Sequence, residues 1–185
     1  METAPSILPP EFHPLLSGSR LGAAPLAWLP PSEVLDPYRQ LLVHDRDMSS
    51  ALAGFHGDAI TLTVLRSRQI DDCYFREVTL HTAAAGTPVE YGLIKIHLEL
   101  FPAEFRPQIL EGKTPYGLVL NATGLAYRSE PQGFFSVSAA PLHALFPQCS
   151  GGEILFGRYN HLVVGENTLL ARIIEILPPT ACLRT

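Results

Sequence analysis

The feature that most constrains the fold is a series of strand-like segments, most of which are joined by short turns and do not alternate with helices. Each segment is rich in β-branched or aliphatic residues and roughly alternates in polarity, which is typical of strands. Consecutive strands joined by short turns pair in antiparallel fashion, because a parallel pair needs a long crossover. We therefore predict a single α+β domain with an antiparallel sheet of about six strands and helices on one side. The six segments are 59–68, 72–82, 89–100, 133–139, 153–164 and 168–179.

Helical patterns occur before the first strand and in the middle of the chain. Residues 32–57 predict two helices, the second with Asp47 as its N-cap and Gly57 as its end. Residues 101–112 and 113–124 predict two short helices or turns, each ending at a glycine. The apolar stripe expected for the first helix consists of Leu35, Tyr38, Leu41 and Leu42.

The first 31 residues differ in composition from the rest of the chain. They contain seven prolines and little periodicity, so we expect an irregular segment that follows the surface and docks through Trp28. The predicted organisation is a proline-rich N-terminal segment over 1–31 and one domain over 32–180.

Composition excludes several classes of partner. The formal net charge is −5, which argues against nucleic acid. No run of apolar residues is long enough for a transmembrane helix, and the N-terminus does not read as a signal peptide. The three cysteines, Cys73, Cys149 and Cys182, are widely spaced, as is usual in a reducing compartment. We expect a cytoplasmic protein with no membrane span, and take a monomer as the working hypothesis.

Common motifs for nucleotides, hydrolysis and metals are absent from the sequence. It has no P-loop, no GxGxxG and no GxSxG, and its seven histidines never adopt a zinc-type spacing. His81, His97 and His161 lie on predicted strands and could meet in space, although singly bonded histidines are the favoured interpretation. We predict no metal and no cofactor.

Two charged residues interrupt apolar strand patterns. Alternation places Arg76 on the same face as Tyr74, Val78 and Leu80, and Glu175 lies among isoleucines and a leucine. A lone buried charge is costly, so residue types alone favour a cross-strand Arg76–Glu175 ion pair, or a Glu175 that reaches water at an edge. The functional alternative is a cavity in which Arg76 binds a carboxylate and Glu175 handles a hydroxyl or a proton.

Four ordered segments resemble the chorismate lyase (chorismate–pyruvate lyase) family. They are FREVTL from residue 75, EGKTPYGLVL from 111, FGRYNHLVV from 156 and IIEILPP from 173. A tryptophan, Trp28, followed by a helix that opens with Asp47 and Met48 is also similar to that family. The resemblance extends from Trp28 to Pro178, and the chain is similar to a divergent member.

The resemblance implies a fold, a reaction and a set of site residues. The fold would be an antiparallel sheet with helices on one side around a small aromatic ligand. The reaction would convert chorismate to 4-hydroxybenzoate and pyruvate without a cofactor, for ubiquinone, plastoquinone or other aromatic biosynthesis. Arg76 would hold the ring carboxylate, and Glu175 would face the ring hydroxyl and the departing ether, which makes these two the catalytic candidates. The substrate-binding positions would be Met48, Arg76, Tyr116, Gly117, Arg158 and Glu175.

The chain also departs from the family pattern. Tyr116 replaces a leucine, and it would either narrow the cavity or lie on the outer surface of its turn. The alternative function is a module of the same fold that binds an aromatic effector without turnover. No helix-turn-helix segment precedes the domain in this sequence, which we take to disfavour a regulator. A lyase acting on a different enol ether is a third possibility.

Overall fold

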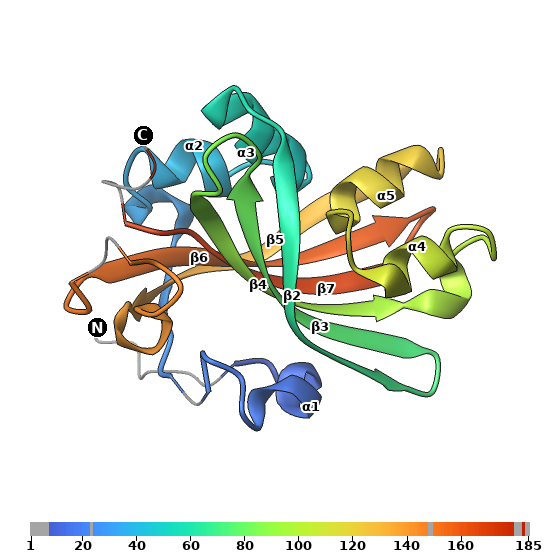
Figure 1. The fold of residues 1–185 in the computed structure, drawn as a ribbon, viewed down its shortest axis with the longest axis horizontal. Helices are drawn as coiled ribbons and strands as arrows, with labels where there is room; N and C mark the ends of the chain where they lie inside the picture. The colour runs from blue at the N-terminus through green and yellow to red at the C-terminus, as the bar shows by residue number, and fades with distance from the viewer. Residues whose placement is uncertain (1–7, 23, 148–149, 180–182, 184–185) are drawn as a thin grey trace.

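A seven-stranded antiparallel sheet organises the residues that the computed structural model describes, which are 8–22, 24–147, 150–179 and 183 (Figure 1). The strand order is β1-β5-β6-β7-β4-β3-β2. Cys149, Cys182 and residue 180 lie outside the described residues. The strands are β1 (Ala27–Leu29), β2 (Ile60–Ile70), β3 (Cys73–Thr82), β4 (Pro88–His97), β5 (Tyr127–Ser138), β6 (Ile154–Val164) and β7 (Thr168–Ile176).

The seventh strand, β1, lies in the proline-rich segment that was expected to be irregular. It pairs with β5, with Trp28 opposite Phe135, and the two rings meet edge to face. Trp28 also covers Gly133, where a Cβ would lie 2.7 Å from the indole ring. Only three residues of β1 are strand, too few for an alternating pattern to emerge from the sequence.

Helices cover both faces of the sheet, whereas the sequence predicted one side (Figure 1). The short helices η1 (Pro10–Phe12) and α1 (His13–Leu16) pack against the face that carries Phe75, Tyr91 and Leu93. The other face carries α2 (Tyr38–Leu42), α3 (Met48–His56), α4 (Arg106–Glu111) and α5 (Tyr116–Ala122). No helix among the described residues is long and apolar enough to span a membrane.

The helix ends follow the predicted capping chemistry in α3 and α4. Asp47 caps α3 by accepting a hydrogen bond from the Ser50 amide at 2.8 Å, and Gly57 ends that helix at φ 64°. The stripe predicted for the preceding helix is wrong at Leu35, whose residue surface is 65% exposed. Pro37 lacks an N–H and disfavours helical geometry before it, so α2 begins only at Tyr38.

Candidate functional site

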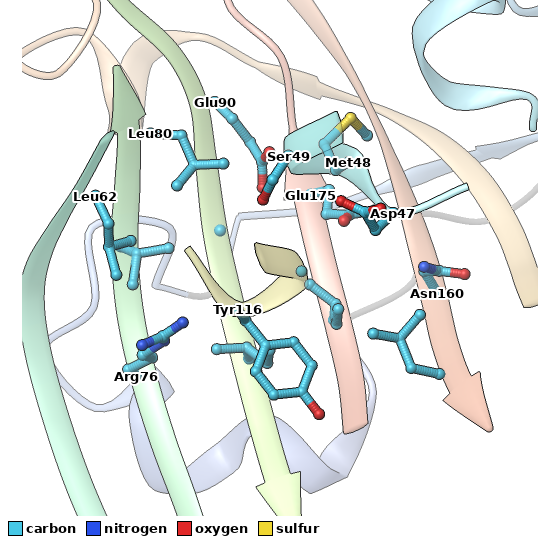
Figure 2. Close-up of a pocket in the computed structure, with 16 residues that line it drawn as sticks. Asp47, Met48, Ser49, Leu62, Arg76, Leu80, Glu90, Tyr116, Asn160 and Glu175 are labelled. Carbon is cyan, nitrogen blue, oxygen red and sulfur yellow. The ribbon is translucent and has the colours of Figure 1, made fainter. Parts of the chain in front are cut away.

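A central cavity lies between the sheet and helices α3 and α5 (Figure 2). Its walls are mainly aliphatic side chains from the strands. The polar groups that line it are Asp47, Ser49, Arg76, Glu90, Tyr116, Asn160 and Glu175. This mixture of apolar walls and a few polar groups is typical of a small-molecule site.

Arg76 enters the central cavity from β3, as the alternation predicts, together with Val78 and Leu80. Its residue surface is 1% exposed, and burial lowers the pKa of its guanidinium. Nη1 lies 3.5 Å from the Ile109 carbonyl oxygen, and Nε has no partner among the described residues. No carboxylate in the described part of the chain lies within ion-pair distance of Arg76. Within the described part of the chain, the buried cation therefore lacks a counter-ion.

The Arg76–Glu175 ion pair favoured by residue types is wrong, because Glu175 pairs with Arg158. Arg158 and Glu175 are direct register partners on β6 and β7, and Arg158 Nε donates to Glu175 Oε2. The guanidinium also donates to the carbonyl oxygens of Leu42 and His44 at 3.1 Å and of Arg46 at 3.2 Å. Arg158 does not line the central cavity, so it lies behind Glu175 and holds the segment that leads into α3.

The first turns of α3 and α5 meet at Asp47 and Gly117. Besides capping α3, Asp47 accepts hydrogen bonds from the Tyr127 hydroxyl at 3.3 Å and from Asn121 Nδ2 at 3.4 Å. A Cβ on Gly117 would overlap Asp47 Oδ1, so only glycine permits this close approach. The contact brings Met48 and the start of α5 to the same wall of the central cavity.

A Gly117→Ala substitution should destabilise the domain by about 1–3 kcal/mol, the usual cost of forcing an extra methyl group into a packed contact. Urea unfolding would measure the loss. Gly54→Ala in α3 is the matched control, since its Cβ would meet no atom within 4 Å and alanine favours a helix interior. Equal stabilities for the two variants would contradict the close contact.

Tyr116 is the first residue of α5, and its side chain lines the central cavity instead of the outer surface. Its ring packs against Phe101 with centroids 5.7 Å apart. Its hydroxyl is buried without a partner among the described residues, and burial raises its pKa well above the ordinary value. The tyrosine therefore narrows the cavity and adds a polar atom to it.

Glu90 is a polar lining residue that the sequence reasoning missed. It lies on β4 with only 4% of its surface exposed, and its Oε2 has no partner in the described structure. Burial, reinforced by the negative charges of Glu175 and Asp47 and opposed by Arg158, holds the pKa of Glu90 well above its ordinary value. The alternation of 88–97 could have identified it, because Glu90 shares a face with Gly92 and Ile94.

The raised pKa of Glu90 makes the stability of the protein depend on pH. Above about pH 4.5 the unfolded glutamate loses its proton while the folded one keeps it, so stability falls as the pH rises towards the folded pKa. Glu90→Gln lacks this titration, and we expect its melting temperature to gain on that of wild type between pH 4 and 7. A difference that stays constant over this range would contradict the prediction.

Comparison with known proteins identifies the fold. No family model and no curated protein matches the sequence. PhnF from Mycobacterium smegmatis superposes with a TM-score of 0.54 and 12% identity over 71% of this chain and 63% of its own length. The separate effector domain of PhnF gives a TM-score of 0.56 and 12% identity over 72% and 88% of the two chains.

Gene product SA0254 from Staphylococcus aureus gives a TM-score of 0.52 and 12% identity over 74% of this chain and 90% of its own. This chain has the fold of the PhnF effector domain. It spans 63% of the length of the longer PhnF chain. The α+β fold class with an antiparallel sheet is confirmed, with seven strands where about six were expected.

Within this fold, most residues chosen from the sequence converge. Arg158 is the exception, as described above. Two of the strand histidines that could have met in space have separate partners instead: His81 contacts Thr79, and His161 contacts Tyr159. The described residues contain no group of three histidine, cysteine or acidic side chains placed to bind a metal ion. The predicted site residues that line the central cavity are Met48, Arg76, Tyr116, Gly117 and Glu175.

Proposed function

We propose that this domain binds a small cyclic carboxylate in the central cavity as an effector, without converting it. The observation that carries the proposal is the buried guanidinium of Arg76, which lines the cavity and has no carboxylate partner among the described residues. A buried charge is normally paired, and a planar guanidinium matches a carboxylate with two parallel hydrogen bonds. A ligand carboxylate would complete this half-made pair.

The walls of the central cavity favour a ring over an extended chain. Val78, Ile94, Leu162 and Ile173 supply apolar surface, and Tyr116 adds an aromatic ring. The likeness to a domain that is itself named an effector domain agrees with binding as the function.

Titration calorimetry with benzoate and benzamide tests the proposal directly. The two probes share a ring and a planar substituent, but only benzoate carries the charge that Arg76 requires. We expect benzoate to bind at least ten-fold more tightly than benzamide, since hydrogen bonds to charged groups contribute about 1.5–3 kcal/mol. Equal affinities, or no binding of benzoate, would contradict it.

A second candidate is the chorismate lyase reaction, which the juxtaposition of Glu90 and Glu175 favours. Burial raises the pKa of Glu90, so Glu90 can donate a proton, and Glu175, ion-paired with Arg158, can accept a hydrogen bond. In this reaction chorismate loses a ring proton and its enolpyruvyl ether, the ring becomes aromatic, and the enol takes up a proton to give pyruvate. Arg76 would hold the ring carboxylate while Glu175 faces the hydroxyl and the ether, with 4-hydroxybenzoate as product.

Incubation with chorismate separates the two candidates. A lyase would release pyruvate and 4-hydroxybenzoate in equal amounts, which chromatography of the reaction mixture would measure. An effector-binding domain would release no pyruvate above the uncatalysed background, although it would still bind benzoate.

The Tyr116→Leu variant, which restores the family residue, should change the affinity for 4-hydroxybenzoate by about ten-fold, as one ill-fitting side chain usually does.

A further inference from the structure

Glu90 is a buried carboxyl group that shares the central cavity with Arg76. Figure 2 shows Glu90, Asp47 and Glu175 towards one end of the cavity and Arg76 towards the other. On β4, Glu90 is four residues from Ile94, the register partner of Arg76, so the two backbone positions are about 13 Å apart at about 3.3 Å per residue. Both side chains line the cavity, so an anion bound at Arg76 would lie closer to Glu90 than this distance.

The carboxyl group of Glu90 has no cation of its own. A Cβ on Gly92 would lie 3.2 Å from Glu90 Oε1, so the glutamate bends over Gly92, which is the register partner of Glu175 on β7. Glu175 is ion-paired with Arg158, whose Nη1 also lies 3.3 Å from His44 Nδ1. Oε2 of Glu90 has no partner in the described part of the chain. Two adjacent carboxyl groups therefore share one cation, which is already paired with Glu175.

The charges around the central cavity show what an ionised Glu90 would do to a bound anion. Asp47 and Glu175 are negative, Arg76 is positive, and Arg158 adds a positive charge behind Glu175. These four charges cancel while Glu90 is neutral, so an ionised Glu90 leaves one negative charge in excess and a bound anion would make it two. Aliphatic walls screen such charges much less than water does, so an ionised Glu90 opposes a bound anion.

We propose that Glu90 is a proton switch for the central cavity, which retains an anion at Arg76 while Glu90 is protonated and releases it when Glu90 ionises. This inference rests on the proposed binding function and adds its regulation by pH. Because linkage is reciprocal, a bound anion also favours the protonated glutamate, so binding takes up a proton from solution. The affinity for an anion therefore falls as the pH rises through the pKa of Glu90.

The surroundings of Glu90 move its ionisation to a higher pH than that of an ordinary glutamate. Burial is the first cause of the raised pKa, and the negative charges of Glu175 and Asp47 add to it, whereas Arg158 opposes them. The protonated, anion-retaining form is therefore favoured at the lower pH, and the releasing form at the higher pH.

Other titratable groups near the cavity respond differently to pH. Burial raises the pKa of Tyr116 well above its ordinary value, whereas burial and the charges of Arg158 and Arg46 lower the pKa of His44 to about 4. Both groups therefore stay neutral near neutral pH. Burial lowers the pKa of Arg76, so loss of its own proton would also weaken anion binding at high pH. A variant at Glu90 retains Arg76 and separates the two causes.

Calorimetric titration with benzoate between about pH 6 and 9 tests the switch. The affinity of wild type should fall about ten-fold or more over this range, since one linked proton changes it by up to about ten-fold per pH unit. Glu90→Gln and Glu90→Met cannot ionise, so their affinities should change by about three-fold or less. Titrations in two buffers of different ionisation enthalpy should show proton uptake by wild type and none by these variants. Glu77→Gln is the matched control and should respond as wild type does, because Glu77 is an equally buried glutamate on the opposite face of the sheet.

A wild-type affinity that does not change with pH, or binding without proton uptake, would overturn the inference. The same pH response in a folded Glu90 variant would overturn it too, since the response would then belong to Arg76. In these cases benzoate still binds, so the proposed function stands. Absence of benzoate binding by wild type over the whole pH range would overturn the function together with the inference.

Discussion

Replacing Arg76 with methionine should raise the melting temperature of the unliganded domain and weaken benzoate binding by on the order of 10²-fold or more. The guanidinium is buried and has no counter-ion among the described residues, so its removal relieves a desolvation cost that no ion pair offsets. Removing one partner of a buried charged contact in a complex typically costs about 2–5 kcal/mol. Stability and affinity should therefore move in opposite directions.

Thermal melts and calorimetric titrations on the same samples would measure both quantities. Arg68→Met is a suitable control, because Arg68 is exposed on the adjacent strand β2 and should leave both quantities nearly unchanged. Arg76→Lys keeps the charge but loses the two-pronged geometry, and we expect weaker binding with the fold retained. A methionine variant that melts well below wild type and still binds benzoate would show that Arg76 is structural.

Replacing Arg158 with leucine should have the opposite effect and destabilise the domain by about 3–5 kcal/mol, the usual result of removing one member of a buried ion pair. Glu175 would be left as an uncompensated carboxylate. The carbonyl oxygens of Leu42, His44 and Arg46 would lose their donors as well. The segment before α3 should become more mobile, and the hydrogen bond by which Asp47 caps α3 at the cavity wall should weaken.

Chemical denaturation would quantify this loss, and a double variant would divide it. Adding Glu175→Leu to Arg158→Leu should recover the part due to the lone carboxylate, while the part due to the carbonyl groups remains. Arg128→Leu, which breaks an exposed pair with Glu130, should cost far less. If the buried and exposed variants lose the same stability, the ion pair behind the cavity has no special role.

Period-two alternation predicted which face each strand residue occupies but not which strands are neighbours. It placed Arg76 correctly on an inward face, and the capping residue Asp47 and the end of α3 were also predictable from local chemistry. The partner of Glu175 was not, because β4 lies between β3 and β7 and separates Glu175 from Arg76. That order is a property of the whole sheet, which local sequence patterns do not encode.

Glu90 was missed for a related reason. In the sequence it stands in the pattern VEYGLIKI, where one acidic residue is compatible with an ordinary solvent-facing position. Its significance depends on Gly92, which leaves space for the glutamate side chain, and on Glu175 from a strand more than eighty residues later. The N-terminal helices were missed because three- and four-residue helices carry almost no periodic pattern.

The position of the cavity within the sheet order bears on how a ligand can enter and leave. Most of its floor belongs to β3, β4, β6 and β7, each hydrogen-bonded to a neighbour on both edges. Opening such interior strands approaches the cost of global unfolding, whereas short surface helices open at a much lower free energy. The ligand should therefore enter and leave past the short helices, such as α5 with its seven residues. The slowest amide hydrogen exchange should occur in strands β3, β4, β6 and β7.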